Sequence, residues 1–391
     1  MPHPIHLPVG RQTWTVDLPP EKHVPLRRTG AVGPTPVGSP RELVLAAMDA
    51  PGGVDAPVHR ALTPDDRVAL VLDESLPHVA ELLAGAVEHL AKSGLGASQI
   101  TVVTPPGGNG AWVEDLPDEF ADVTLEAHDP ADRKRIGYVA TTKAGRRVYL
   151  NRTLVEADAV VVLTGRGFDA SGGPSGGESA IFPVLSDAET RAGPTPPGEA
   201  AEVAWLLGMP IYVQVIEGPG GSVAEVLVGL PSTVDEGAKR QEAHWKFTVP
   251  AAADLVVATV SGDPARTDFA ALAQAAATAA QVVAPDGRIA LLTTAAPDLG
   301  DGATLLRGLD DPVAAAKKLA RRNPPDAAAA TRWANAATRA SLFVASGWAE
   351  DVVEDLFATP LASAAELQRL VDAATRVIVI PDAHNSRVDI G

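Results

Sequence analysis

The side chains best suited to chemistry in this sequence lie in three loops, each of which follows a predicted strand. The first loop holds Asp73 and His78, and a carboxylate there could orient the imidazole for acid–base work. The second, between Thr104 and Gly110, holds Gly107 and Gly108. Because open α/β sheets place their ligands at the carboxyl ends of the strands, we expect these loops to line a common crevice.

The third loop, Gly165–Ser179, is the richest in glycine. It contributes the candidates Asp169, Ser175, Gly176, Gly177 and Ser179. Such a loop can bring backbone N–H groups against an anion or a cofactor, although it could equally be a crossover without a ligand. Neither GxGxxG nor GxxxxGK[ST] occurs in the sequence, so a nucleotide-dependent enzyme has no motif to support it.

The other reactive residue types are few. The chain has 9 histidines and no cysteine, which excludes disulfides, thiolate metal ligands and a cysteine nucleophile. No HExxH and no histidine pair at i and i+4 is present, so the sequence does not indicate which metal, if any, the protein binds. His89 is interpreted as a surface or boundary residue of a helix, and His384 as a solvated residue of the tail.

Short apolar runs alternate with amphipathic segments along the chain, which predicts parallel α/β sheets with right-handed crossovers. The predicted strands are Val68–Asp73, Ile100–Thr104, Val123–Ala127, Ala159–Gly165, Pro210–Val215, Leu255–Val260, Arg288–Thr294, Ser341–Ser346 and Val377–Ile380. The predicted helices are Val79–Ser93, Phe269–Val283, Val313–Arg321, Ala327–Ala340, Ala349–Leu356 and Ala364–Ala374.

The length and composition of the chain limit the possible domain organisation and the possible binding partners. At 391 residues, two α/β domains with a cleft between them are expected, residues 1–240 and 241–391, with Ser232–Lys246 as a polar linker. The proline-rich residues 1–60 are expected to wrap the first domain. A formal charge of −17 argues against nucleic acid, and the absence of a long apolar run argues against a membrane span, so we expect a cytoplasmic protein.

The order of the segments resembles the nickel-pincer lactate racemase family. The resemblance rests on a strand ending in Asp73, the stretch from His128 through Gly145–Asn151, and Ser175-Gly-Gly177 followed by Ile181-Phe-Pro183. It continues to Arg376–Pro381 and covers most of the chain after about residue 60. It implies two α/β domains around a cleft and a racemase or epimerase of 2-hydroxy acids, whose nickel pincer nucleotide is tethered to a lysine and served by histidines.

The positions that the family uses for this chemistry carry other residues here. Ser179 stands where the tethering lysine is expected, Asp169 stands at a histidine position, and Leu76 stands at an arginine position. The Gly-x-His-Arg type loop is replaced by Pro106–Asn109, and Arg191–Glu199 lacks a further expected histidine. Because a serine cannot form the lysine's link, the resemblance argues against a covalently bound cofactor and against standard lactate racemisation.

Two hypotheses from different classes remain. The chain is either a divergent enzyme of the family, with changed chemistry or a loosely held cofactor, or a non-catalytic member that binds a small molecule or a partner protein without any cofactor. A small-molecule ligand is expected in both cases. The sequence does not decide between them, nor does it give the oligomeric state.

Overall fold

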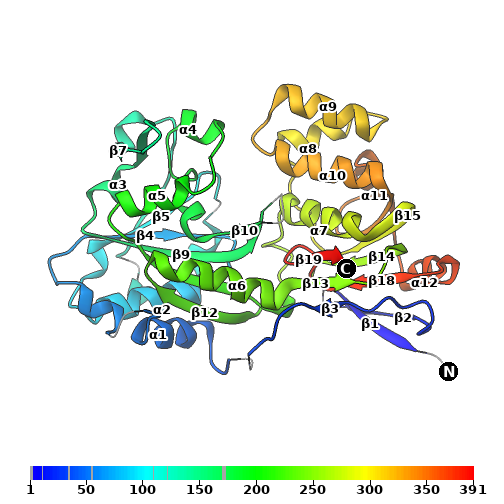
Figure 1. The fold of residues 1–391 in the computed structure, drawn as a ribbon, viewed down its shortest axis with the longest axis horizontal. Coiled ribbons are helices and arrows are strands. Elements are labelled where there is room, and N and C mark those ends of the chain that lie inside the picture. The colour runs from blue at the N-terminus through cyan, green and yellow to red at the C-terminus, as the bar shows by residue number, and fades with distance from the viewer. Residues whose placement is uncertain are drawn as a thin grey trace.

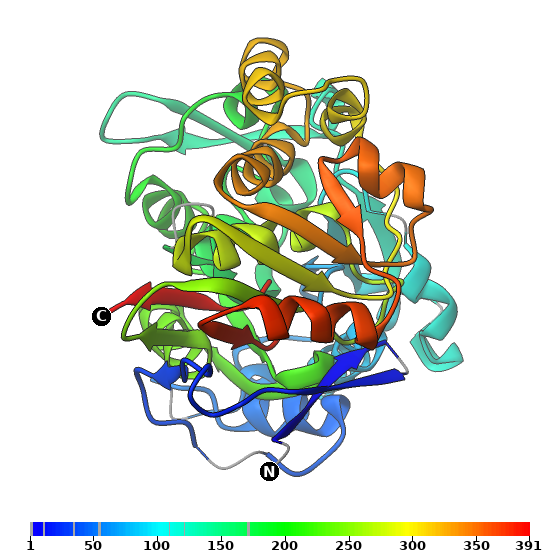
Figure 2. The same cartoon turned by 90° about the vertical axis from the view of Figure 1, so that its right-hand side faces the viewer.

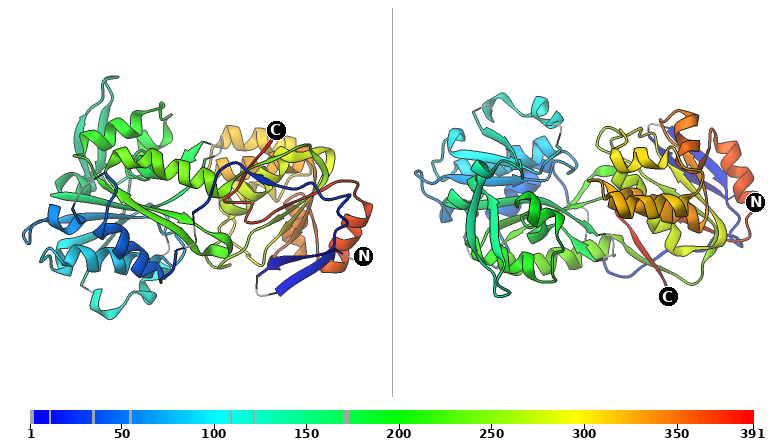
Figure 3. Two further views of the ribbon diagram at one scale, coloured as in Figure 1. Left: turned by 60° about the horizontal axis from the view of Figure 1, so that its bottom comes forward. Right: turned by 90° about the horizontal axis from the view of Figure 1, so that it is seen from above.

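Two α/β bodies lie side by side in the computed structural model, which describes residues 3–10, 12–33, 36–53, 56–108, 110–120, 122–169 and 173–391. Figure 1 shows the first body on the left and the second on the right, and Figure 3 shows the same division from two other sides. Both bodies contain a mainly parallel sheet covered by helices, as the alternation of strand and helix predicts. None of the described helices is both long and apolar enough to cross a membrane.

The first body is built on a seven-stranded sheet with the order β12-β11-β9-β4-β5-β6, to which β10 adds by pairing with β9. Its strands are β4 (Val68–Leu72), β5 (Ile100–Thr104), β6 (Thr124–Ala127), β9 (Ala159–Phe168), β10 (Pro174–Ser175), β11 (Ile211–Glu217) and β12 (Val223–Gly229). All five residues of β4 are buried, as expected of a central strand with helices on both faces. Only β10 and β12 pair antiparallel with their neighbours.

Helices and one hairpin complete the first body. The helices are α1 (Pro40–Asp49), α2 (Val79–Ala91), α3 (Arg152–Glu156), α4 (Ala188–Ala192), α5 (Glu199–Leu206) and α6 (Val234–Trp245), and the separate hairpin is β7 (Ile136–Thr141) with β8 (Arg147–Asn151). Helix α1 starts with a capping box, in which Ser39 and Glu42 satisfy each other's backbone N–H groups. Single-turn 3₁₀ helices are η1 (Val58–Ala61), η2 (Ala97–Gln99), η3 (Ala111–Asp115), η4 (Asp118–Phe120), η5 (Arg133–Arg135), η6 (Gly177–Ala180), η7 (Pro219–Gly221) and η8 (Pro231–Thr233).

The second body has a fully parallel five-stranded sheet with the order β17-β16-β15-β14-β18. Its strands are β14 (Ala253–Thr259), β15 (Val283–Leu292), β16 (Ser341–Ala345), β17 (Ala358–Pro360) and β18 (Val377–Ile380), and a smaller sheet contains β13 (Lys246–Val249), β19 (Arg387–Ile390) and β3 (Arg27–Arg28). Its helices are α7 (Phe269–Val282), α8 (Asp301–Leu306), α9 (Pro312–Arg322), α10 (Ala327–Arg339), α11 (Glu350–Asp355) and α12 (Ala364–Ala373). The core on the helix side centres on Trp333, which is fully buried and donates its indole N–H to the carbonyl oxygen of Leu356 at 2.7 Å.

The N-terminal arm packs on the second body, not on the first. Strands β1 (Pro4–Val9) and β2 (Gln12–Asp17) form an antiparallel hairpin whose apolar side joins the core formed by Leu255, Val257 and the α12 side chains. Figure 2 shows this hairpin beside β18 and α12. The expectation that the arm wraps the first domain is therefore wrong for its first strands, because their alternating apolar residues cover the open face of the second sheet.

The segment expected as a polar linker is helical. Helix α6 occupies it and buries Val234, His244 and Trp245, while its charged residues face outward. Only one side of this segment is apolar, so its mean composition looks like that of a linker although the pattern suits a surface helix. The domain boundary near residue 240 stays a prediction and lies within this helix.

Candidate functional site

The strand order of each sheet defines where a ligand crevice should lie. In the first sheet the chain adds β5 and β6 to one side of β4 and then returns to add β9 on the other side. In the second sheet it adds β15, β16 and β17 to one side of β14 and returns to add β18 on the other. At each reversal, two neighbouring strands have connections that run to opposite sides of the sheet: β4 and β9 in the first sheet, β14 and β18 in the second. The diverging loops are expected to leave a crevice between them at the carboxyl edge of the sheet.

At the first reversal the structure brings two of the predicted loops together. Asp73, just after β4, accepts a hydrogen bond from the backbone N–H of Gly165 at 3.1 Å, across the β4–β9 boundary. Its other carboxylate oxygen accepts from the N–H and hydroxyl of Ser75 at 3.0 and 2.6 Å. Asp73 is thus fully engaged in fixing the loop at this edge.

The predicted glycines of the second loop lie beside the first loop. The carboxylate of Glu74 accepts the indole N–H of Trp112 at 2.6 Å and the N–H of Gly110 at 3.2 Å. A Cβ built on Gly108 would lie 1.3 Å from that same carboxylate, so the close approach requires glycine there. Gly107 has a positive φ of 90° and open space around its Cα. Asn109 lies outside the described residues.

The third loop folds back onto β9. Ser175 ends β10 and pairs with Gly167, and Gly176 adopts a φ of 81° over the carbonyl oxygen of Gly165, from which an added Cβ would be only 2.0 Å away. Ser179 is exposed and donates its hydroxyl to the carbonyl oxygen of Gly176 at 2.9 Å. Asp73 and Gly176 therefore both contact Gly165, while Ser175 and Ser179 are joined to this point through Gly167 and Gly176.

Residues 173–177 also read GxSxG, the pattern that presents the nucleophile of α/β hydrolases at a turn between a strand and a helix. Here Ser175 lies on a hairpin strand that pairs antiparallel with β9, and a single 3₁₀ turn follows it. Among the described residues, no histidine contacts its hydroxyl. The local geometry is not that of a nucleophile elbow.

The two remaining predicted residues lie away from this cluster. Asp169 closes the β9–β10 hairpin, where its carboxylate accepts the N–H of Gly173 at 2.9 Å and lies near the Arg332 guanidinium of the second body. His78 starts α2 in a left-handed conformation with φ 51°, and its ring faces Glu81 at 3.5 Å. Its nearest carboxylate partner is therefore on its own helix and not in the Asp73 loop.

Arg166 is a charged residue of this site that the sequence analysis did not single out. It is only 6% exposed, and two of its guanidinium nitrogens, Nε and Nη1, have no hydrogen-bond partner among the described residues. Burial lowers the pKa of Arg166, and the carboxylates of Glu178 and Asp235 oppose that shift. Gly177 leaves room for the guanidinium, since a Cβ there would lie 2.6 Å from Nη1.

A second missed group joins the two bodies. Arg266, in the loop after β14, forms an ion pair with Glu217 of β11 at 2.7 Å and also donates to the carbonyl oxygen of Ser75. Asp382, after β18, accepts from the N–H and hydroxyl of Ser261 and from the N–H of Gly220, which lies in the β11–β12 turn. The loops at the second reversal therefore contact the first body directly, and the rule that placed the first three loops would have found them.

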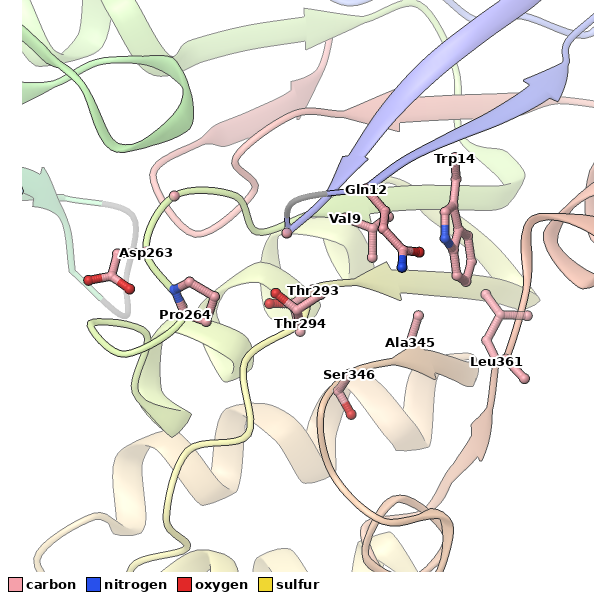
Figure 4. Close-up of a pocket in the computed structure, with 13 residues that line it drawn as sticks. Val9, Gln12, Trp14, Asp263, Pro264, Thr293, Thr294, Ala345, Ser346 and Leu361 are labelled. Atoms are coloured by element: carbon pink, nitrogen blue, oxygen red, sulfur yellow. The ribbon is translucent and has the colours of Figure 1, made fainter.

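The described residues form a pocket of about 800 Å³ at the carboxyl edge of the second sheet. Figure 4 shows its lining, with Trp14 and Leu361 at one end and Asp263 and Pro264 at the other. Thr293, Thr294 and Ser346 place hydroxyl groups along it, and the β1–β2 hairpin closes one side. None of the nine predicted site residues lines this pocket.

The described residues offer one cluster with the composition of a metal site, Asp49, His59 and His89. His89 is fully buried, and its two ring nitrogens face different partners: Nδ1 lies 3.4 Å from Asp49, while Nε2 accepts the N–H of His59 at 3.1 Å. The Lys92 ammonium already pairs with Asp49 at 3.2 Å, and the His59 N–H already occupies Nε2 of His89. Burial lowers the pKa of His89 to about 4, and its Nδ1 has no hydrogen-bond partner among the described residues.

The comparisons with known proteins agree with this architecture. Residues 9–192 match the family model of the lactate racemase N-terminal domain. The solved lactate racemase apoprotein from Thermoanaerobacterium thermosaccharolyticum is similar over 99% of this chain and 100% of its own, with a TM-score of 0.76 and 17% identity. A Thermotoga maritima structural-genomics protein is similar over 92% of this chain and 100% of its own, with a TM-score of 0.63 and 12% identity.

No curated protein sequence matches the chain. The two structural likenesses show the fold, and the family match adds sequence evidence for residues 9–192, which run from the end of β1 to the end of α4. The resemblance seen in the order of the sequence segments is thereby confirmed. By sequence, residues 9–192 match the lactate racemase N-terminal domain family, and the chain as a whole has the fold of the lactate racemase apoprotein.

Proposed function

We propose that this protein keeps the hydroxy-acid-binding scaffold of its family and has lost the racemisation that depends on a tethered nickel pincer nucleotide. The observation that carries the proposal is the residue at the tethering position. The Ser179 side chain is a hydroxyl that bonds to Gly176, and a hydroxyl offers no amine for the link. The residues of this loop do not fit a covalently attached cofactor.

Neither Lys143 nor Lys246 lies on the loop that carries Ser179. The ammonium of Lys246 pairs with Glu242 at 3.5 Å on α6, and Lys143 lies in the turn between β7 and β8. Asp169, at a position where the family has a histidine, is engaged with the hairpin backbone through Gly173. These contacts support a site in which the positions of the family's reactive side chains carry residues, such as Asp169 and Ser179, that form hydrogen bonds to the loop backbone.

The ligand that the scaffold retains would bind where the crevice meets the pocket of the second sheet. Arg266 is held between Glu217 and Ser75, and the Arg332 guanidinium on α10 lies near the carboxylates of Asp268 and Asp169. Guanidinium groups recognise a carboxylate by paired, charge-assisted hydrogen bonds, and the pocket adds hydroxyl partners from Thr294 and Ser346. A small 2-hydroxy acid combines the two kinds of group.

The decisive experiment is an intact-mass measurement of protein purified from its native host, with nickel quantified on the same sample. The proposal predicts the mass of the unmodified chain and nickel far below one equivalent. A mass increase that matches a nucleotide adduct, or stoichiometric nickel, would contradict it and favour a working enzyme. A lactate racemase assay on the same sample, with both enantiomers as starting material, is expected to show no interconversion.

A cytoplasmic location and a small-molecule partner remain part of the proposal. Fractionation of native cells tests the first. Isothermal titration with L- and D-lactate tests the second, because saturable heat is expected for at least one enantiomer. Heat that does not saturate with either enantiomer would remove the hydroxy-acid assignment.

A further inference from the structure

The first body contains a pocket of its own, away from the strand ends of its sheet. This pocket has a volume of about 1000 Å³ and lies between the β7–β8 hairpin and α4, which are both at the top of the first body in Figure 1. Its size suits a small-molecule site. It shares no lining residue with the cluster around Gly165 or with the pocket of the second sheet, so it is a separate place on the molecule.

Arginine side chains from two different segments line this pocket, namely Arg133, Arg146 and Arg147. Arg133 and Arg147 are exposed, and within the described ranges neither forms a hydrogen bond or an ion pair through its guanidinium. Two arginines close to them in the sequence but outside the pocket, Arg135 and Arg152, each pair with a carboxylate, at 3.8 and 3.5 Å. Cations that gather in one hollow repel each other, and a bound anion relieves that repulsion.

The remaining charged groups of the pocket are largely engaged with the protein. Arg146 pairs with the buried carboxylate of Glu199 at 3.2 Å. Both oxygens of Asp187 accept hydrogen bonds from Thr190, one from its N–H at 2.9 Å and one from its hydroxyl at 3.2 Å. Glu189 is exposed and has no ion pair among the described residues. The charges left for a ligand are thus two guanidinium groups, opposed by one carboxylate.

An apolar wall adjoins these guanidinium groups. Arg147 and Tyr149 are two residues apart on β8 and therefore project from the same face of the strand. The Tyr149 ring packs against Tyr138 of β7, with the ring centroids 5.6 Å apart, and Pro130 and Ile136 extend the apolar lining. The pocket can therefore hold an organic group beside the anion that the arginines attract.

We propose that this pocket binds a small aromatic phosphate ester, with its phosphate at Arg133 and Arg147 and its ring against Tyr149. Two guanidinium forks offer more donors than the two oxygens of one carboxylate can accept, whereas a phosphate presents three acceptor oxygens and about two negative charges. The inference goes beyond the proposed function, because the hydroxy-acid site lies elsewhere and uses none of these residues.

The test is isothermal titration of phenyl phosphate into the full-length protein at about pH 7.5, where the ester is a dianion. Wild type is expected to bind with saturable heat, and Arg133→Gln and Arg147→Gln are each expected to weaken binding about tenfold, because each removes hydrogen bonds between charged groups. Arg135→Gln is the matched control, since Arg135 lies on the same short helix as Arg133 but outside the pocket, and its affinity should equal that of wild type.

A gain of affinity separates binding from damage to the fold. Glu189→Gln removes the opposing carboxylate and is expected to tighten phenyl phosphate binding by roughly twofold to fivefold, which a misfolded variant would not do. Inorganic phosphate is expected to bind wild type several-fold more weakly than the ester, since it lacks the ring. Heat that does not saturate with wild type, equal affinities of Arg133→Gln, Arg147→Gln and Arg135→Gln, or inorganic phosphate as tight as the ester would each overturn the inference.

Discussion

Replacing Asp382 by alanine should weaken the junction between the two bodies more than any exposed acidic substitution. The carboxylate is 3% exposed and accepts three hydrogen bonds, from the N–H and hydroxyl of Ser261 and from the N–H of Gly220. Hydrogen bonds to a charged group contribute about 1.5–3 kcal/mol each, and such contributions are less than additive within one network. The expected loss in free energy of unfolding is therefore roughly 3–6 kcal/mol for Asp382→Ala.

Urea denaturation followed by far-UV circular dichroism measures this loss, and hydrogen exchange at Gly220 locates it. The amide of Gly220 belongs to the first body, yet its partner lies in the second, so its protection reports the junction itself. Asp372→Ala is the control, because the Asp372 carboxylate is exposed and, among the described residues, accepts a hydrogen bond only from Gln368. A loss below about 1 kcal/mol together with unchanged exchange at Gly220 would refute the reasoning, because a surface-like cost excludes a buried cross-link.

Three further predictions follow from groups already described. His89 has its pKa lowered to about 4 in the fold, whereas the unfolded chain has the ordinary value of 6.5, so the unfolded state binds more protons between these values. The free energy of unfolding should therefore fall as the pH is lowered from 6.5 to 4, by at most roughly 3 kcal/mol. Urea titrations at several pH values should show a weaker dependence of this free energy on pH for His89→Gln than for wild type. The same dependence in both proteins would contradict this. Gly176→Ala should destabilise the fold by more than about 3 kcal/mol, because its Cβ would lie 2.0 Å from a carbonyl oxygen. Gly145→Ala is the control, since Gly145 has a similar φ of 84° and open space around it, and it should cost about 1 kcal/mol. Thermal unfolding measures both variants, and similar losses would show that the contact does not matter. Ser179→Lys should give an adduct in intact-mass spectra when the protein is produced with the enzymes that make the pincer cofactor, while wild type gives none; an adduct on wild type would show that another residue holds the cofactor.

Most of the fold was accessible from the sequence because buried parallel strands are continuous apolar runs. Strands Ile100–Thr104 and Val377–Ile380 match their predicted bounds, and the predicted helix Val79–Ser93 differs from α2 only by two residues at its end. The hairpin of β7 and β8 was not predicted, because its strands are half-exposed and show no clear alternation. The length of β15 was underestimated because it begins in a polar stretch, Ala284–Gly287.

The candidate site was only partly predictable, for a different reason. The three loops of the first body were found because each directly follows a continuous apolar strand, and the second and third are also rich in glycine. Arg266 and Asp382 lie in loops that follow strands of the second body, so the strand-end rule places these loops at the sheet edge. Their contacts join residues far apart in the sequence, such as Gly220 with Asp382, and could not be read from it. The prediction that His89 is a surface or boundary residue was wrong, because α1 and η1 pack over that side of α2 and bury the side chain. The sequence of the helix alone does not show which other elements will cover it.

The packing of the N-terminal hairpin on the second sheet bears on how the chain is made. Strands β1 and β2 leave the ribosome long before the residues that they cover, which extend from Leu255 to Val377. The first sheet is contiguous in sequence and can fold as soon as β12 has emerged, whereas the hairpin must wait with its apolar side uncovered. Completion of the second body therefore waits until β18 has been synthesised, and a chain that lacks β1 and β2 would expose the face of the second sheet that contains Leu255 and Val257.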